Sequence, residues 1–143
     1  MKRPLLLALI LLPVSLPAHK AYQMDMAAII NEADLVMIAQ VTMASSKRET
    51  CKTACEYRLA PEWMLKGAFA GKNISFCYSV HFRDEEKGCP GVHYILPPVP
   101  RTIGTGQMVI AAFKKDAGAS GVLRGSGMFG IGETDAVSSL IKK

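Results

Sequence analysis

The chain has 143 residues, half of them hydrophobic, and carries 17 Lys and Arg against 12 Asp and Glu, a formal net charge of +5. Its basic pairs are scattered along the sequence, at Lys47-Arg48, Lys114-Lys115 and Lys142-Lys143. A nucleic-acid surface needs basic residues gathered on one face with stacking aromatic side chains between them, so the composition argues against a nucleic-acid partner.

The first residues are typical of an export signal. Met1-Lys2-Arg3 is a short positive start, Leu5–Leu12 is an uninterrupted apolar run, and Ala18 offers a small residue for cleavage. The run is far shorter than the ~20 residues that span a bilayer. We therefore expect residues 1–18 to be a signal peptide, cleaved after Ala18 or, alternatively, after Ala21. Residues 19–143 then form one domain, periplasmic or secreted, without stable membrane insertion.

The first half of that domain shows a helical pattern followed by strand patterns. Apolar residues at helical spacing predict a helix over residues 24–33, and the following apolar stretch predicts a strand over 35–43. A polar loop over 45–53 leads to a second strand, whose apolar row is Tyr57, Leu59, Trp63 and Leu65. Pro61 within it indicates an edge or a bulge.

The second half contains the clearest strand and the longest loop. In residues 74–83 the apolar Ile74, Phe76, Tyr78, Val80 and Phe82 alternate with Ser75, Cys77, Ser79, His81 and Arg83. Residues 84–106 have no periodic pattern and predict a long loop. Strands are expected over 108–113 and 122–133. Thr134 is then placed to cap a final helix, with Lys142-Lys143 at its C-terminal end.

This order predicts a mainly β domain, a small OB-like five-stranded barrel with an N-terminal helix and a short C-terminal helix. A β-sandwich is the rival architecture.

Four cysteines follow the expected signal peptide, namely Cys51, Cys55, Cys77 and Cys89. An even number in an oxidising compartment predicts two disulfides. Cys51–Cys55 and Cys77–Cys89 are favoured because each pair closes a short loop near an expected turn. Cysteines four apart in an extended strand would lie ~13 Å apart, so the first pair requires a bend. A crossed pairing, in which Cys51 or Cys55 reaches Cys77, stays open.

Three short stretches resemble the netrin-like and tissue-inhibitor-of-metalloproteinases-like OB domains of exported proteins. They are Glu32-Ala33-Asp34 before an apolar strand, a Tyr57-x-Leu59 strand ending in Trp63-Met64-Leu65-Lys66-Gly67, and Gly106 before the apolar strand 108–113. The resemblance implies an OB fold. Those inhibitors bind catalytic zinc through an N-terminal cysteine, and neither expected mature start, His19 or Tyr22, is a cysteine. The inhibitory mechanism is therefore not expected here.

Other motifs have simpler readings. Gly125-Ser126-Gly127-Met128-Phe129-Gly130 matches G-x-G-x-x-G, but no βαβ unit surrounds it, so a bulged and curved strand is the better explanation. Candidate metal ligands are His19, His81 and His93, with Cys77 and Cys89 beside the last two. Neither a Ser–His–Asp nor a Cys–His arrangement stands out, so we expect no catalytic activity and no cofactor.

The function predicted from sequence is that of an exported binding module that engages another envelope protein. The expected contact surface is the long loop, through Arg83, Asp84, Glu85, Glu86, Lys87, His93, Tyr94 and Arg101. The alternative is a periplasmic zinc- or copper-binding protein.

Overall fold

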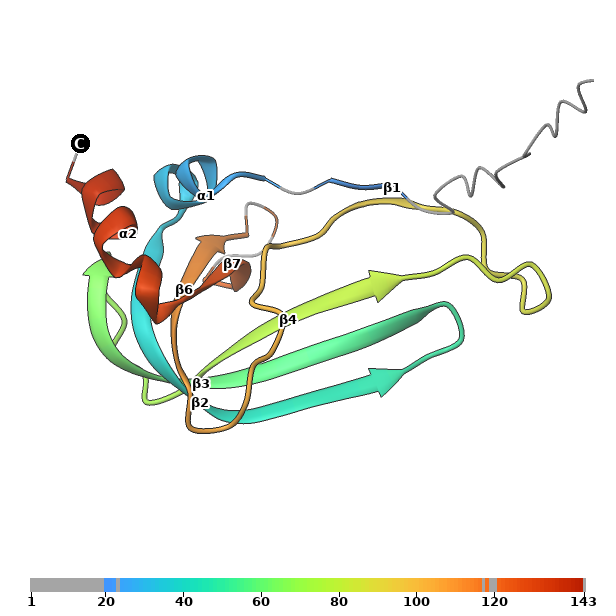
Figure 1. Ribbon diagram of the computed structural model, residues 1–143, viewed down its shortest axis with the longest axis horizontal. Helices are drawn as coiled ribbons and strands as arrows, with labels where there is room; N and C mark the ends of the chain where they lie inside the picture. The colour runs from blue at the N-terminus through green and yellow to red at the C-terminus, as the bar shows by residue number, and fades with distance from the viewer. Residues whose placement is uncertain (1–19, 23, 117, 119–120, 143) are drawn as a thin grey trace, which may run out of the picture.

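The computed structural model describes residues 20–22, 24–116, 118 and 121–142 (Figure 1). The expected signal peptide and His19 lie outside the described residues. Five long strands form one antiparallel sheet in the order β4-β3-β2-β6-β7. Their bounds are β2 (Leu35–Arg48), β3 (Lys52–Lys66), β4 (Ile74–His81), β6 (Met108–Lys115) and β7 (Leu123–Gly130). The mainly β prediction is confirmed, and the five long strands lie in one sheet and not in the two facing sheets of a sandwich.

The two faces of the sheet carry separate cores because side chains alternate along each strand. On one face, Met37, Leu59 and Phe76 belong to a buried cluster made almost entirely by the strands. On the other face, Val36 and Ile110 pack against α1 (Met26–Glu32) and α2 (Thr134–Ile141). Both helices lie together at one end of the molecule (Figure 1).

The ends of the helices agree only partly with the expected caps. Asp25 begins α1, and its carboxylate accepts a hydrogen bond of 2.8 Å from the Ala28 amide. Thr134 was expected from sequence to cap α2, but it does not. It is the first residue of that helix, and its hydroxyl donates to the Ile131 carbonyl. The reason is that a 3-10 turn, η1 (Ile131–Glu133), already continues the chain into the helix.

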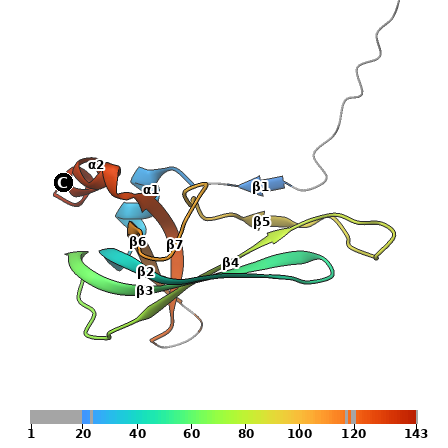
Figure 2. The same ribbon diagram turned by 60° about the horizontal axis from the view of Figure 1, so that its bottom comes forward.

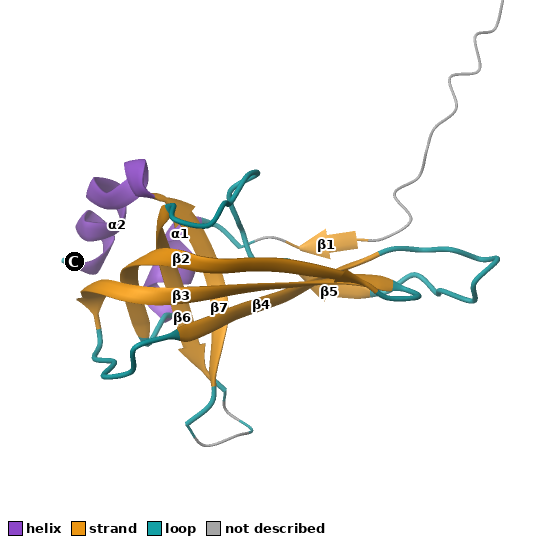
Figure 3. Ribbon diagram, turned by 90° about the horizontal axis from the view of Figure 1, so that it is seen from below, coloured by secondary structure: helices purple, strands orange, loops and turns teal. Residues whose placement is uncertain are grey.

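The polar loop expected over residues 45–53 is instead a strand hairpin. β2 and β3 stay paired as far as Arg48 and Thr53, so only residues 49–51 turn. We call this extension, residues 43–57, together with β4, the arm; it projects away from the helices (Figures 1 and 3). The sequence of this part of β2 shows no alternation of apolar and polar residues, because neither face of the strand is buried beyond residue 43. Trp63, expected in the buried row, is 68% exposed.

The two edge strands, β4 and β7, approach each other without forming a ladder between them in the described residues. The two strands come close at Gly125, where an added Cβ would collide with the ring of Phe76. The strand β7 has a register shift opposite Ala112 and Phe113, which confirms the bulge expected from its glycines. Closure of the expected barrel is therefore not established by backbone hydrogen bonds.

The stretch 84–106, expected to be one loop, divides into three parts. Residues 84–89 form a tight turn in which Asp84 and Cys89 exchange backbone hydrogen bonds. The short strand β5 (His93–Ile95) pairs in parallel with β1 (Lys20–Tyr22), and the two lie beside the arm (Figure 2). Val99 and Ile103 then pack against the strand core.

The favoured disulfide pairing is wrong. Cys51 bonds to Cys89, with their Cα atoms 5.2 Å apart, while Cys55 and Cys77 are free thiols. Cys51 and Cys55 stay apart because β3 begins at Lys52 and makes no bend between them. The turn 49–51 lies beside the turn 84–89, so the bond joins the ends of two hairpin-like turns.

Candidate functional site

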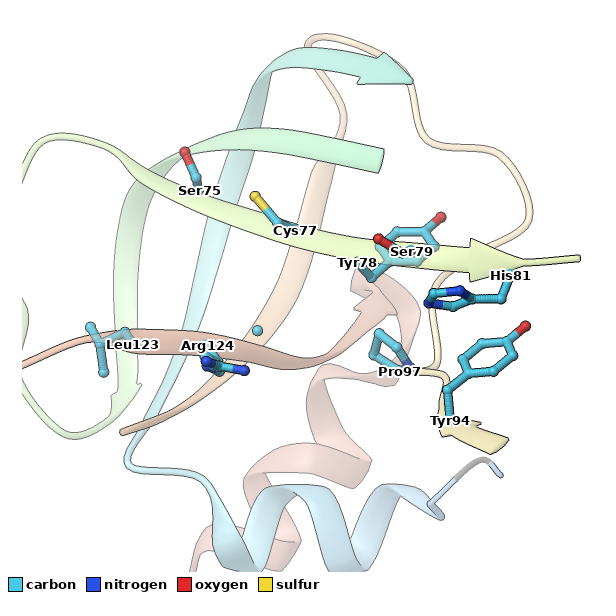
Figure 4. Close-up of a pocket in the computed structure, with 10 residues that line it drawn as sticks. Ser75, Cys77, Tyr78, Ser79, His81, Tyr94, Pro97, Leu123 and Arg124 are labelled. Atoms are coloured by element: carbon cyan, nitrogen blue, oxygen red, sulfur yellow. The ribbon is translucent and has the colours of Figure 1, made fainter. Parts of the chain in front are cut away.

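A groove of about 560 Å³ separates the edge strands β4 and β7 (Figure 4). Strand β4 forms one wall and residues 123–125 of β7 form the other, while Tyr94 and Pro97 close one end. The lining residues are Ser75, Cys77, Tyr78, Ser79, His81, Tyr94, Pro97, Leu123, Arg124 and Gly125. We call this feature the β4–β7 groove.

The backbone of β4 offers unpaired groups to this groove. The Phe82 amide donates to the Cys51 carbonyl at 3.0 Å, and the register between β3 and β4 has no shift. In an antiparallel ladder every second residue turns its N–H and C=O away from the neighbouring strand. Counting back from Phe82, the residues whose backbone N–H and C=O groups point away from β3 are Ser75, Cys77, Ser79 and His81. All four line the groove.

The far end of the groove is aromatic. The rings of His81 and Tyr94 lie 4.9 Å apart between centroids, at 57°. Figure 4 shows both rings at the end of β4, facing each other. Tyr94 belongs to β5 and His81 to β4, so the contact joins the predicted loop to the sheet. Among the loop residues named from sequence whose side chains are described, Tyr94 lines the groove and the others do not.

Charge in the groove is confined to one side. Arg124 is its cation, and its Nε lies 2.7 Å from the Asp116 carboxylate. The Arg124 side chain is nevertheless 74% exposed. Asp116 neutralises Arg124, and the other described lining residues include no Asp, Glu or Lys, so a neutral occupant fits better than a charged one.

The two free thiols lie on opposite faces of the arm. Cys55 pairs in register with Tyr78, and Cys77 pairs with Glu56, so each thiol shares a face with its partner and not with the other thiol. Cys77 is exposed, but partial desolvation raises the pKa of its thiol, and the Glu56 carboxylate raises it further. Burial also raises the pKa of Tyr78, with hydrogen bonds to Tyr57 and Cys55 adding to the effect. A protonated thiol is a weak nucleophile, so the raised pKa argues against Cys77 as a nucleophile at neutral pH.

Most of the predicted loop residues lie away from the groove. Arg83 pairs with Glu85, and the Asp84 carboxylate accepts from the amides of Glu86 and Lys87, which stabilises the turn beside the disulfide. Arg101 is exposed in the segment that leads from β5 to β6. These residues therefore do not line the groove together with Tyr94. Of His93, the structure describes the backbone position alone.

The candidate zinc ligands are not brought together among the described residues. Cys89 is buried and bonded to Cys51, so it is not a free thiolate. Across the described residues there is no group of three or more His, Cys, Asp or Glu side chains placed to hold a metal ion. His81, the one histidine candidate with a described side chain, contacts a tyrosine ring.

No model of a known protein family matches the chain, and no curated protein matches its sequence. No helix within the described residues has the length and apolar character needed to cross a membrane.

Sequence reasoning missed the β7 side of the groove, Leu123, Arg124 and Gly125, because those residues come next to β4 through the curvature of the sheet. A usable signal was present on the other side. Residues 74–81 contain neither a charged residue nor a proline, which is unusual for a strand that forms the edge of a sheet.

Proposed function

We propose that this chain is an exported binding module, a five-stranded OB-type barrel with one open seam, that engages another protein of the cell envelope. The resemblance to netrin-like OB domains, the strand order and the near approach of β4 to β7 support the fold. The Cys51–Cys89 disulfide supports an oxidising compartment, periplasmic or extracellular.

The main support for the proposal is the gap between strands β4 and β7, where the two edges do not pair with each other. We call this gap the seam. An edge strand with unpaired backbone groups is normally covered, charged or interrupted, because it otherwise pairs with another chain. Here the seam holds a groove of about 560 Å³ with serine, tyrosine and arginine side chains around it. Such a surface suits recognition of a polypeptide. A catalytic role has no comparable support, since the thiol in the groove has a raised pKa.

The experiment is site-specific photocrosslinking of the exported protein in intact cells. A photoreactive amino acid replaces Ser79 in the groove, Glu86 in the turn beside the disulfide, or Ser139 on the opposite end of the molecule. We expect one dominant protein adduct from Ser79, competed by excess purified chain, and none of it from Ser139.

An adduct of equal yield from all three positions, or none from Ser79 and Glu86, contradicts the proposal. Native mass spectrometry of the same preparation tests the metal alternative, which requires a bound zinc or copper ion.

A further inference from the structure

We infer that the edge of β4 accepts an extended segment of the partner protein as an additional strand, lying in the β4–β7 groove. This inference rests on the proposed function and specifies how the partner is held. Main-chain hydrogen bonds to a sheet edge provide affinity in this mode of recognition, and side-chain pockets along the strand provide selectivity.

The β4 edge lacks the features that keep a free edge from pairing. Its sequence, Ile74 to His81, contains no Lys, Arg, Asp, Glu or Pro, and its register with β3 is unbroken. Charge, proline and bulges are the usual protections. The other free edge of the arm is different. β2 pairs with β6 only up to Gln40, and the edge beyond it carries Lys47 and Arg48.

The surroundings of β4 select a single extended chain over a second copy of this protein. The groove is bounded by residues 123–125 of β7 on one side and by Tyr94 and Pro97 at one end. A second copy could offer its own β4 only from within an equally enclosed groove. An isolated segment, such as a tail or linker of a partner, has no such neighbours.

The length and the chemistry of the segment follow from the lining. The near approach of Gly125 to Phe76 closes the groove to an added strand at its Ser75 end. From Cys77 to His81 the edge runs for four residue steps, about 13 Å at ~3.3 Å per residue, so it pairs with a segment of about four residues. The side chains at the outward-facing positions are small, apart from His81 at the aromatic end. Arg124 is paired with Asp116, and the rest of the described lining has no Asp, Glu or Lys, so a neutral segment fits better than a charged one.

The test uses short linear peptides displayed on phage and selected against the purified exported protein. A selected peptide is then measured by fluorescence polarisation against the wild-type chain and against Ser79→Pro and Ser46→Pro. Ser79→Pro removes an amide that faces the groove and is not used by β3. Ser46→Pro is the matched control, because the Glu49 amide donates to Lys52 and the alternation therefore turns Ser46 away from β3 on the opposite edge.

We expect Ser79→Pro to raise the Kd about tenfold or more, through the lost hydrogen bond and the clash of the ring with the incoming strand. Ser46→Pro should stay within about twofold. Two versions of the peptide, N-methylated at alternate amides in the two possible registers, are tested on the wild-type chain. At least one should lose binding about a hundredfold, because several main-chain bonds are removed together.

The inference is overturned if no linear peptide is enriched, if enriched peptides are charged, or if both proline variants bind alike. It is also overturned if neither N-methylated peptide is weakened, a result that does not depend on the folding of any variant. A dimer abolished by Ser79→Pro would likewise replace the partner segment by a second copy. If photocrosslinking at Ser79 still captures a protein while these results fail, the binding function stands and strand addition is wrong.

Discussion

Replacing Cys51 and Cys89 together by Ala removes the bond that holds the tip of the arm to the turn 84–89. The two residues are 38 positions apart, and loop-closure entropy for a cross-link of that span corresponds to about 4 kcal/mol. The lost stability arises mainly in the unfolded chain, which gains conformations when the cross-link is gone. A loss of this size lowers the melting temperature of a domain of this length by more than about 10 °C.

The assay is urea unfolding followed by circular dichroism, with Cys55→Ser/Cys77→Ser as the matched control. The control removes the two free thiols and should change the free energy of unfolding by no more than about 1 kcal/mol. Thiol labelling of the denatured wild-type chain should modify two cysteines and leave Cys51 and Cys89 linked. Our account of the pairing is refuted if the control variant loses more stability than Cys51→Ala/Cys89→Ala, or if a peptide map links Cys55 to either residue.

Two further predictions concern the seam and its thiol. Gly125→Ala should cost about 1–3 kcal/mol of unfolding free energy because the new Cβ meets the Phe76 ring, whereas Gly130→Ala, which meets open space, should stay within about 0.5 kcal/mol; equal losses would contradict the contact. Alkylation of Cys77 should be slower than that of an unperturbed thiol and should accelerate in Glu56→Gln, since the raised pKa keeps the thiol protonated. With the folded pKa raised, the contribution of this thiol to stability is present at neutral pH and is lost as the pH rises above the ordinary value of a cysteine. A rate unaffected by Glu56→Gln would remove the carboxylate as a cause.

The resemblance to netrin-like domains and the export signal remain predictions. The fate of the predicted loop is more instructive. The lack of a periodic pattern in residues 84–106 correctly indicated that they form no long strand. The same lack of pattern could not show that Val99 and Ile103 cover the core while the turn beside the disulfide stays exposed. Burial of an irregular segment depends on what the sheet leaves uncovered, and that is not encoded in local spacing.

Local pattern by itself determined the order of the two helices and the five long strands in this protein, but not the short strands β1 and β5. The alternation of Ile74, Phe76 and Tyr78 and the helical spacing of Met26, Ile29, Ile30 and Ala33 were sufficient, because each reflects a face that one element must bury. The tertiary structure alone decided the partner of Cys51, the length of the arm and the presence of the groove. These features depend on how far the sheet curves and which turns it brings together, and contacts between distant parts of the chain leave no periodic trace in the sequence.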